Sequence, residues 1–132
     1  MNTKVHFSST TDHWSTPNKV YEELNKEFNF NDDPCPLHAL QGVDGLSREW
    51  GASTFCNPPY SKIKEWVKYA YNQAIQGKTI VLLIPSRTDT RWWHEYVMKA
   101  TEIRFCKGRL KFGYAKNSAP FPSAIVIWKG LP

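Results

Sequence analysis

The sequence lacks any apolar run long enough to cross a membrane. Its longest run, residues 80–85, is far shorter than the roughly 20 residues that a spanning helix needs. Cysteine is scarce, since Cys35, Cys56 and Cys106 are widely separated and no Cys/His cluster has zinc spacing. We therefore expect no membrane partner and no metal. The odd cysteine count without a signal peptide predicts a reducing, cytoplasmic setting, with Cys56 as a small buried residue.

Acidic residues are too few to balance the basic ones. The chain has 17 Lys and Arg against 12 Asp and Glu, a formal net charge of +5. In the last third, basic residues alternate with aromatic ones, for example from Phe105 to Tyr114. This pattern is typical of a surface that neutralises phosphates and stacks on bases. A basic surface that serves only solubility explains the charge equally well.

The length of 132 residues fits one domain, and the apolar fraction of 41% is enough for a core. Residues 1–13 are polar and rich in Ser and Thr, so we expect a flexible N-terminal arm, followed by a single domain over residues 14–132. No internal repeat or low-complexity tract divides the chain.

Apolar periodicity predicts helices that alternate with strands. Val20, Leu24 and Phe28 recur every four residues and predict a helix with Ser15 or Thr16 as its cap. Two further helices are expected at about 61–77 and 90–99. The expected strands are 28–34, Ser53–Cys56, Thr79–Pro85, 102–106 and 124–128. Because Thr79–Pro85 is almost entirely apolar, it should be buried on both faces. This alternation predicts an α/β fold with a mostly parallel sheet and flanking helices.

The segment with the clearest chemistry is Asn57-Pro58-Pro59-Tyr60, here called the Asn-Pro-Pro-Tyr loop, which directly follows the strand Ser53–Cys56. Ligands of open parallel sheets bind beyond the carboxyl ends of the strands. Two prolines stiffen the loop and withhold two N–H groups, so an amide side chain, carbonyl oxygens and an aromatic ring are presented. A simple turn that ends the strand is the alternative.

This set of groups suits methylation of the exocyclic amine of adenine. The amine is a poor nucleophile because its lone pair is delocalised into the ring. Hydrogen bonds from the amine to the Asn57 oxygen and the Pro58 carbonyl favour a pyramidal nitrogen, and the Tyr60 ring can stack on the base. A base in a duplex must first be flipped out of the stack.

Several segments, in order, resemble the phage-type DNA N6-adenine methyltransferases, and the resemblance covers almost the whole chain. The matching segments are Asp12-x-Trp14-x-Thr16-Pro17, Asp33-Pro34-Cys35, Gly45-Leu46 with Trp50, Phe55-Cys56-Asn57-Pro58-Pro59-Tyr60, Arg87-Thr88-Asp89-Thr90 with Trp92-Trp93-His94, Gly108-Arg109-Leu110-x-Phe112, and Ala119-Pro120-Phe121-Pro122-Ser123-Ala124. The resemblance implies a compact Rossmann-like fold, S-adenosylmethionine as methyl donor, adenine in double-stranded DNA as acceptor, and a phage or prophage gene expressed in a bacterial cell.

The resemblance implies roles for the residues of this chain that match the family motifs. Asn57, Pro58, Pro59 and Tyr60 would form the catalytic loop, and the residues implied for donor binding are Trp14, Thr16, Pro17, Asp33, Pro34, Asp44 and Asn57. Asp33 would accept hydrogen bonds from the α-amino group of the donor, and Asp44 would bind its ribose or adenine amine. The sequence departs from many methyltransferases because no Gly-x-Gly turn follows Asp33, so the geometry of the donor site is less well defined.

The expected DNA contacts come from two later segments. The residues are Arg87, Arg91, Trp92, Lys107, Arg109 and Lys111. The arginines and lysines would contact phosphates, and Trp92 or Trp93 could fill the gap left by a flipped base. The alternative for the tryptophans is that they pack in the core. The alternative for the basic turn is that it is merely solvated. Asp89 is expected to cap the helix that follows. His94 is interpreted as structural, since amine methylation can lose its proton after transfer.

Two other functions remain open. The same loop serves other planar amines, including those of RNA and of protein glutamine, although the basic, aromatic-rich last third favours nucleic acid. The missing glycine turn and the small size also fit an inactive nucleic-acid-binding module. Neither the recognition sequence nor the oligomeric state follows from the sequence, and a homodimer on DNA is one possibility.

Overall fold

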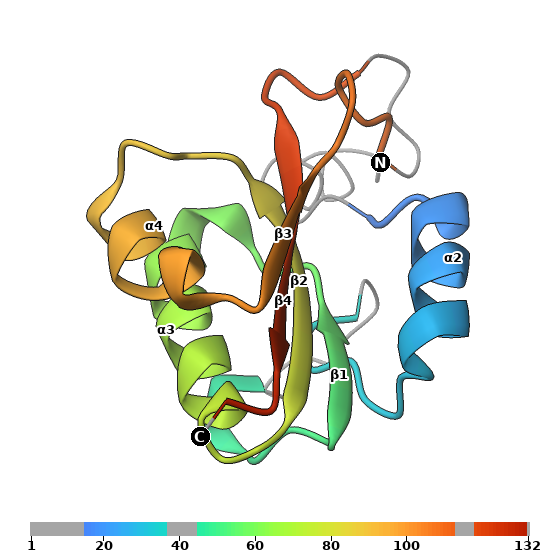
Figure 1. Ribbon diagram of the computed structural model, residues 1–132. Coiled ribbons are helices and arrows are strands. Elements are labelled where there is room, and N and C mark those ends of the chain that lie inside the picture. Colours follow the sequence, from blue (N-terminus) through green and yellow to red (C-terminus); the bar gives the residue numbers. More distant parts are fainter. Residues whose placement is uncertain (1–14, 37–44, 113–117, 132) are drawn as a thin grey trace, which may run out of the picture.

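The computed structural model describes residues 15–36, 45–112 and 118–131. The helices are α2 (Asn18–Phe28), α3 (Ile63–Ala74) and α4 (Arg91–Tyr96), with 3-10 turns η1 (Gly45–Ser47), η2 (Tyr60–Lys62) and η3 (Val97–Lys99). The strands are β1 (Ser53–Cys56), β2 (Thr79–Pro85), β3 (Glu102–Phe105) and β4 (Ser123–Lys129). Each helix and strand corresponds to an element predicted from apolar periodicity, and β1 and β2 have the predicted bounds (Figure 1).

The sheet is mixed, in the order β1-β2-β4-β3. Strands β1 and β2 are parallel, whereas β4 is antiparallel to both β2 and β3. The α/β class is confirmed, whereas the expectation of a mostly parallel sheet is not, because the sheet is mixed. Helices α3 and α4 provide the crossovers that parallel strands require, while β4 enters between β2 and β3 as an antiparallel strand, which needs no crossover.

The strand expected at 28–34 is reduced to one parallel bridge between Asp32 and Thr54. Two backbone hydrogen bonds support it, from Asn31 N to Ser53 O at 2.8 Å and from Phe55 N to Asp32 O at 3.1 Å. The segment thus runs beside β1 in the same direction. Its pairing ends at Asp33, because Pro34 has no N–H to continue the ladder.

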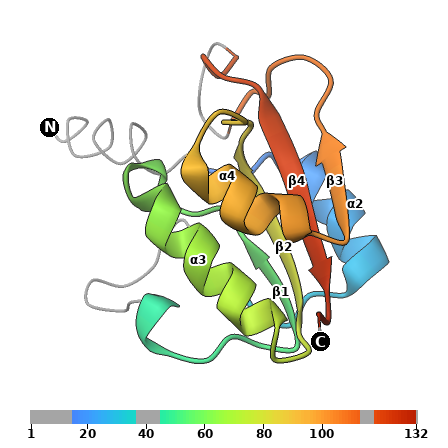
Figure 2. The same cartoon turned by 60° about the vertical axis from the view of Figure 1, so that its left-hand side comes forward.

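Helices cover both faces of the sheet, giving three layers (Figures 1 and 2). On one face, α3 and α4 pack against Ile80, Leu82 and Ile84 of β2. On the other face, α2 packs through Leu24 against a cluster that includes Val81 and Leu83. Alternate residues of β2 therefore belong to two cores, which explains why its sequence is apolar throughout.

The caps of two helices differ from expectation. Helix α2 begins at Asn18 with Pro17 at the cap position, and no side chain caps it. Thr16 instead uses its hydroxyl elsewhere, as described below. For α4, the cap is Thr90 rather than Asp89, because the Thr90 side chain accepts a hydrogen bond from Trp93 N at 3.3 Å. Either side chain has the oxygen that this role needs, and only the backbone path selects between them.

Candidate active site

The residues that the sequence predicts to carry the chemistry lie at one edge of the sheet. The carboxyl ends of the Asp32 segment, β1 and β2 lie at this edge because these segments are parallel. Strand β4 begins there, with Ser123 opposite Pro85. Asp33, the Asn-Pro-Pro-Tyr loop and the segment before β4 therefore meet where open α/β sheets bind ligands.

The Asn57 side chain is buried, with 2% of its surface exposed, and is held at both ends. Its Nδ2 donates to the hydroxyl of Thr16 at 3.1 Å, and its Oδ1 accepts from the Tyr60 hydroxyl at 3.1 Å. Thr16 comes from the segment directly before α2. The amide is thus oriented by two segments that lie far apart in the sequence.

The backbone of the loop is stiff. Pro59 is extended, with φ −67° and ψ 128°, and its carbonyl accepts from Lys62 N at 3.2 Å to start η2. Pro58 is buried beside it. Since neither proline can donate a backbone hydrogen bond, the chain turns away from the sheet directly after Asn57.

Tyr60 is packed edge-on against Phe121, with ring centroids 5.3 Å apart and an interplanar angle of 79°. Phe121 also contacts Phe112, at 5.9 Å between centroids. Burial raises the pKa of the Tyr60 hydroxyl above its usual value, so Tyr60 remains a hydrogen-bond donor at neutral pH. The ring and hydroxyl of Tyr60 are consequently fixed by different partners.

Asp33 is partly buried, and its Oδ1 accepts from Cys35 N at 3.1 Å. Burial raises the pKa of Asp33 to about 6, and the neighbouring Asp32 charge adds to the rise, whereas the Cys35 N–H and Arg48 oppose it. A positively charged group that binds beside Asp33 would therefore stabilise the ionised form of its carboxyl group.

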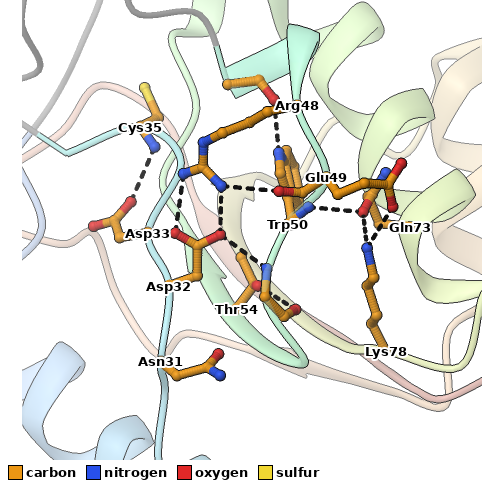
Figure 3. A network of polar contacts seen from close by, with 12 residues as sticks. Asn31, Asp32, Asp33, Cys35, Arg48, Glu49, Trp50, Thr54, Gln73 and Lys78 are labelled. Atoms are coloured by element: carbon orange, nitrogen blue, oxygen red, sulfur yellow. Dashed lines mark hydrogen bonds and ion pairs between the residues drawn. The ribbon is translucent and has the colours of Figure 1, made fainter.

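Asp32, by contrast, is fully engaged (Figure 3). Its two oxygens accept from the Arg48 guanidinium at 2.9 and 2.8 Å, and Oδ2 also accepts from Gly51 N at 2.9 Å. Burial alone would raise the pKa of Asp32, but the Arg48 and Gly51 hydrogen bonds outweigh it and lower the pKa below its usual value.

The turn after Asp33 is held by η1. Pro34 is buried, and a Cβ added to Gly45 would lie 2.6 Å from the Pro34 carbonyl oxygen and 2.8 Å from the Trp66 ring. The Gly45 carbonyl accepts from Trp50 Nε1 at 2.7 Å. Only glycine fits this contact, so the glycine required near the turn lies on the facing segment rather than directly after Asp33.

The predicted donor residues Thr16, Pro17, Asp33, Pro34 and Asn57 are all within the described ranges and lie around this sheet edge. Trp14 and Asp44, also predicted to bind the donor, lie outside the described residues.

The predicted DNA-contacting cations fall in two segments that leave the same edge. Arg87 and Arg91 follow β2, whereas the other three follow β3, which runs parallel to β2. All five are exposed: Arg87, Arg91, Lys107, Arg109 and Lys111. Within the described ranges, only Arg91 among them makes an ion pair, to Glu95 at 3.9 Å.

Trp92 is buried, with 7% of its surface exposed, and Trp93 is more so. Both belong to the cluster between the sheet and α3–α4. The interpretation of Trp92 as a side chain that inserts into DNA is therefore not compatible with this conformation, and core packing is what the structure shows. The reason is that α4 turns this side of its surface toward the sheet.

Two residues of the site were missed in the sequence. Arg48 has no motif around it, although the adjacent pair Asp32 and Asp33 signals that one carboxylate needs a counterion. Phe121 lies in the matched segment before β4, but its contact with Tyr60 depends on the sheet order. Cys56, in contrast, is buried as predicted, and burial raises its thiol pKa well above the usual value.

Across the three described ranges, no group of three or more His, Cys, Asp and Glu side chains is arranged to hold a metal ion. In the same ranges, no helix has the length and apolar character that crossing a membrane requires.

Comparison with known proteins gives a consistent result. The family model described as DNA N-6-adenine-methyltransferase (Dam) matches residues 3–131. A protein of Escherichia phage T1 named DNA N-6-adenine-methyltransferase is 31% identical over 103 residues, covering 70% of this chain and 43% of the relative. One of the same name from Haemophilus phage HP1 is 32% identical over 107 residues, covering 72% and 62%. The chain thus spans about half the length of these curated relatives. It belongs to the DNA N-6-adenine-methyltransferase (Dam) family.

Proposed function

We propose that this chain transfers a methyl group from S-adenosylmethionine to the N6 amine of adenine in double-stranded DNA. Family membership and the names of the two phage relatives support the reaction class. The observation that carries the proposal is the Asn57 amide, held by Thr16 and Tyr60 at the carboxyl edge of β1. The parallel pairing of β1, β2 and the Asp32 segment supports a Rossmann-like core, with β4 as an antiparallel insertion.

The Asn57 oxygen activates the acceptor amine in this proposal. An amide oxygen has two lone pairs, so it can accept from an N6–H of adenine in addition to the Tyr60 hydroxyl. The Pro58 carbonyl takes the other N6–H. Both bonds strengthen as the nitrogen becomes pyramidal and positive, which lowers the barrier more than it stabilises the bound base.

Tyr60 supplies the surface on which the flipped base rests. Its ring is steadied by Phe121, and its hydroxyl fixes the amide that faces the amine. Flipping the base costs a few kcal/mol, and stacking of a base on an aromatic side chain recovers about 1–3 kcal/mol.

The residues at Asp33 fit the proposed donor. When bound, S-adenosylmethionine supplies a methyl group on a positively charged sulfur. Its α-amino group needs an acceptor, and Asp33 offers a carboxylate that burial disfavours and an ammonium group would stabilise. Thr16 accepts a hydrogen bond from Asn57, and Trp14, Pro17, Pro34 and Asp44 complete the donor set implied by the family motifs.

Arg87, Arg91, Lys107, Arg109 and Lys111 would hold the DNA backbone in this proposal. All five are exposed at the edge that bears Asn57. Such contacts position the duplex without reading its sequence. The source of the phage relatives favours action in the cytoplasm of a bacterial host. The homodimer stays a prediction.

The proposal is tested with radiolabelled donor and, in parallel, DNA, RNA and protein as acceptors, followed by mass analysis of the digested nucleosides. We expect label in N6-methyladenine of DNA and its loss in Asn57→Ala. Calorimetry with the donor and thermal unfolding show whether that variant still binds and folds. Donor binding without methylation of DNA would favour RNA or protein as acceptor if they are labelled. The absence of saturable donor binding would favour an inactive nucleic-acid-binding module.

A further inference from the structure

Asp32 and Asp33 are neighbours in sequence but have different partners. Asp32 receives two hydrogen bonds from Arg48 and one from Gly51 N. Asp33 accepts from Cys35 N and, within the described ranges, makes no ion pair. Among the described residues, one carboxylate is thus neutralised by Arg48, and the other has the Cys35 backbone N–H as its hydrogen-bond partner.

Arg48 is close enough to act on both carboxylates. Its guanidinium binds both Asp32 oxygens (Figure 3), and its charge also opposes the rise in the pKa of Asp33 that burial causes. A guanidinium group matches a carboxylate with two parallel hydrogen bonds and is always charged at neutral pH. If Asp32 could not hold it, Arg48 would turn to Asp33 and cover the oxygens that an incoming ammonium group needs.

The surrounding backbone keeps the pair in one arrangement. The Arg48 carbonyl accepts from the Tyr69 hydroxyl at 2.5 Å, and Gly51 packs so closely on Asn31 that an added Cβ would lie 2.6 Å from Asn31 Oδ1. The segments that carry Arg48 and Asp32 are therefore fixed against each other. In this frame, the guanidinium donates to both Asp32 oxygens and to the Glu49 carbonyl at 3.0 Å, so Asp32 is its ion-pair partner among the described residues.

We propose that Asp32 is a positioning residue that holds the Arg48 guanidinium away from Asp33, so that the Asp33 carboxylate is kept for the α-amino group of the methyl donor. This inference rests on the proposed function of Asp33. It assigns opposite tasks to two adjacent carboxylates, since one binds the protein's own cation and the other binds the donor's cation.

The test is calorimetry of S-adenosylmethionine binding to Asp32→Asn, to Arg48→Met and to the double variant. Asp32→Asn should weaken binding about tenfold, because Arg48 then competes for Asp33. The double variant removes the competitor as well and should bind within about threefold of the unmodified protein. A purely structural role for the pair predicts the reverse, since losing both partners would be at least as harmful as losing one.

Two controls separate this effect from general damage. Glu27→Gln removes a carboxylate from another two-pronged arginine pair, that with Arg104 on β3, and should leave donor affinity unchanged. Methylthioadenosine lacks the α-amino group, so its affinity should be the same in all variants. Thermal unfolding verifies folding, and Asp32→Ser carries the same expectation should the asparagine variant fail to fold.

The Asp33→Asn variant distinguishes a failure of the proposed role of Asp33 from a failure of the inference about Asp32. If it leaves donor affinity unchanged, the proposed role of Asp33 fails and this inference fails with it. If Asp33→Asn weakens binding but Asp32→Asn does not, only the inference is overturned. The inference is also overturned, and the role of Asp33 kept, if the double variant binds no better than Asp32→Asn.

Discussion

The hydroxyl of Tyr60 donates to Oδ1 of Asn57 at 3.1 Å, across the two prolines that separate them. The other end of the Asn57 amide donates to Thr16, from the segment before α2. An amide that is held in this way keeps its oxygen in one place, and electrostatic stabilisation of an amine depends on such preorganisation. The first two predictions concern these two hydrogen bonds.

Thr16→Val keeps the shape of the side chain but removes the acceptor for Asn57 Nδ2. Loss of this buried hydrogen bond costs about 1 kcal/mol, so we expect lower stability and about tenfold slower methyl transfer as the amide loses part of its orientation. Single-turnover kinetics and thermal unfolding measure the two effects. Thr16→Ser retains the hydroxyl and should restore most of the rate; equal loss in both variants would contradict an orienting role.

Tyr60→Phe removes the hydroxyl and keeps the ring. Because stacking is retained, we expect the flipped state to form normally and the transfer rate to fall by about tenfold or less. Fluorescence of 2-aminopurine at the target base reports flipping, and quenched-flow assays report transfer. Tyr60→Ala should impair both. A flipping defect in Tyr60→Phe as large as that of Tyr60→Ala would argue against this division between ring and hydroxyl.

Donor affinity should fall as the pH drops below about 6, where Asp33 becomes protonated and loses its charge. Calorimetry between pH 5 and 8, values chosen to bracket that pKa, follows the change. Asp33→Asn should bind the donor weakly at every pH and lose most of this dependence. A wild-type affinity that does not vary across the range would contradict a role for the Asp33 charge.

The same shift predicts a gain in stability for Asp33→Asn at neutral pH. The pKa of Asp33 is raised on folding, from 3.8 to about 6, so its contribution to stability is fully present below the lower value and is lost as the pH rises through about 6. After allowance for partial solvent exposure, removing the charge should stabilise the fold by about 1–2 kcal/mol at pH 7.5. Denaturant unfolding at pH 4 and 7.5 measures the difference, which should be much smaller at the lower pH.

Replacing Arg87 and Arg91 by Ala should weaken DNA binding and reduce its salt dependence. For each phosphate that is no longer neutralised, the slope of log K against log salt falls by about 1. The matched control is Lys26→Ala with Lys129→Ala, which changes net charge equally; Lys129 pairs with Thr79 and so lies at the opposite end of β2. Equal losses of affinity in both double variants would indicate a nonspecific effect of net charge.

Gly45→Ala should destabilise the site as well as the fold. The added Cβ would meet the Pro34 carbonyl oxygen at 2.6 Å, and the backbone after Asp33 must shift to relieve the contact. Overpacking of this kind costs about 1–3 kcal/mol, and donor binding should weaken with it. Gly77→Ala is a suitable comparison, because no atom lies within 4 Å of its added Cβ and its positive φ provides backbone strain alone. Similar donor affinities in both variants would show that the contact with Pro34 does not support the site.

The strands β1 and β2, the three helices and the Asn-Pro-Pro-Tyr loop were predictable because each depends on contacts close in the sequence. Apolar periodicity, prolines and the abrupt end of an apolar strand are local signals. The family resemblance was also readable from ordered motifs, and the match over residues 3–131 confirms it. The sequence did not predict which of two adjacent residues takes a given role. For example, Thr90 rather than Asp89 caps α4, because the backbone path decides.

The sequence alone determined the types of chemical group that the chain carries and the elements that bear them. Only the tertiary structure decided their partners: Thr16 with Asn57, Phe121 with Tyr60, and Arg48 with Asp32 rather than Asp33. It also placed β4 antiparallel between β2 and β3 and turned Trp92 into the core. The physical reason is that strand order and side-chain pairing depend on contacts between residues distant in sequence, for which local patterns carry no signal.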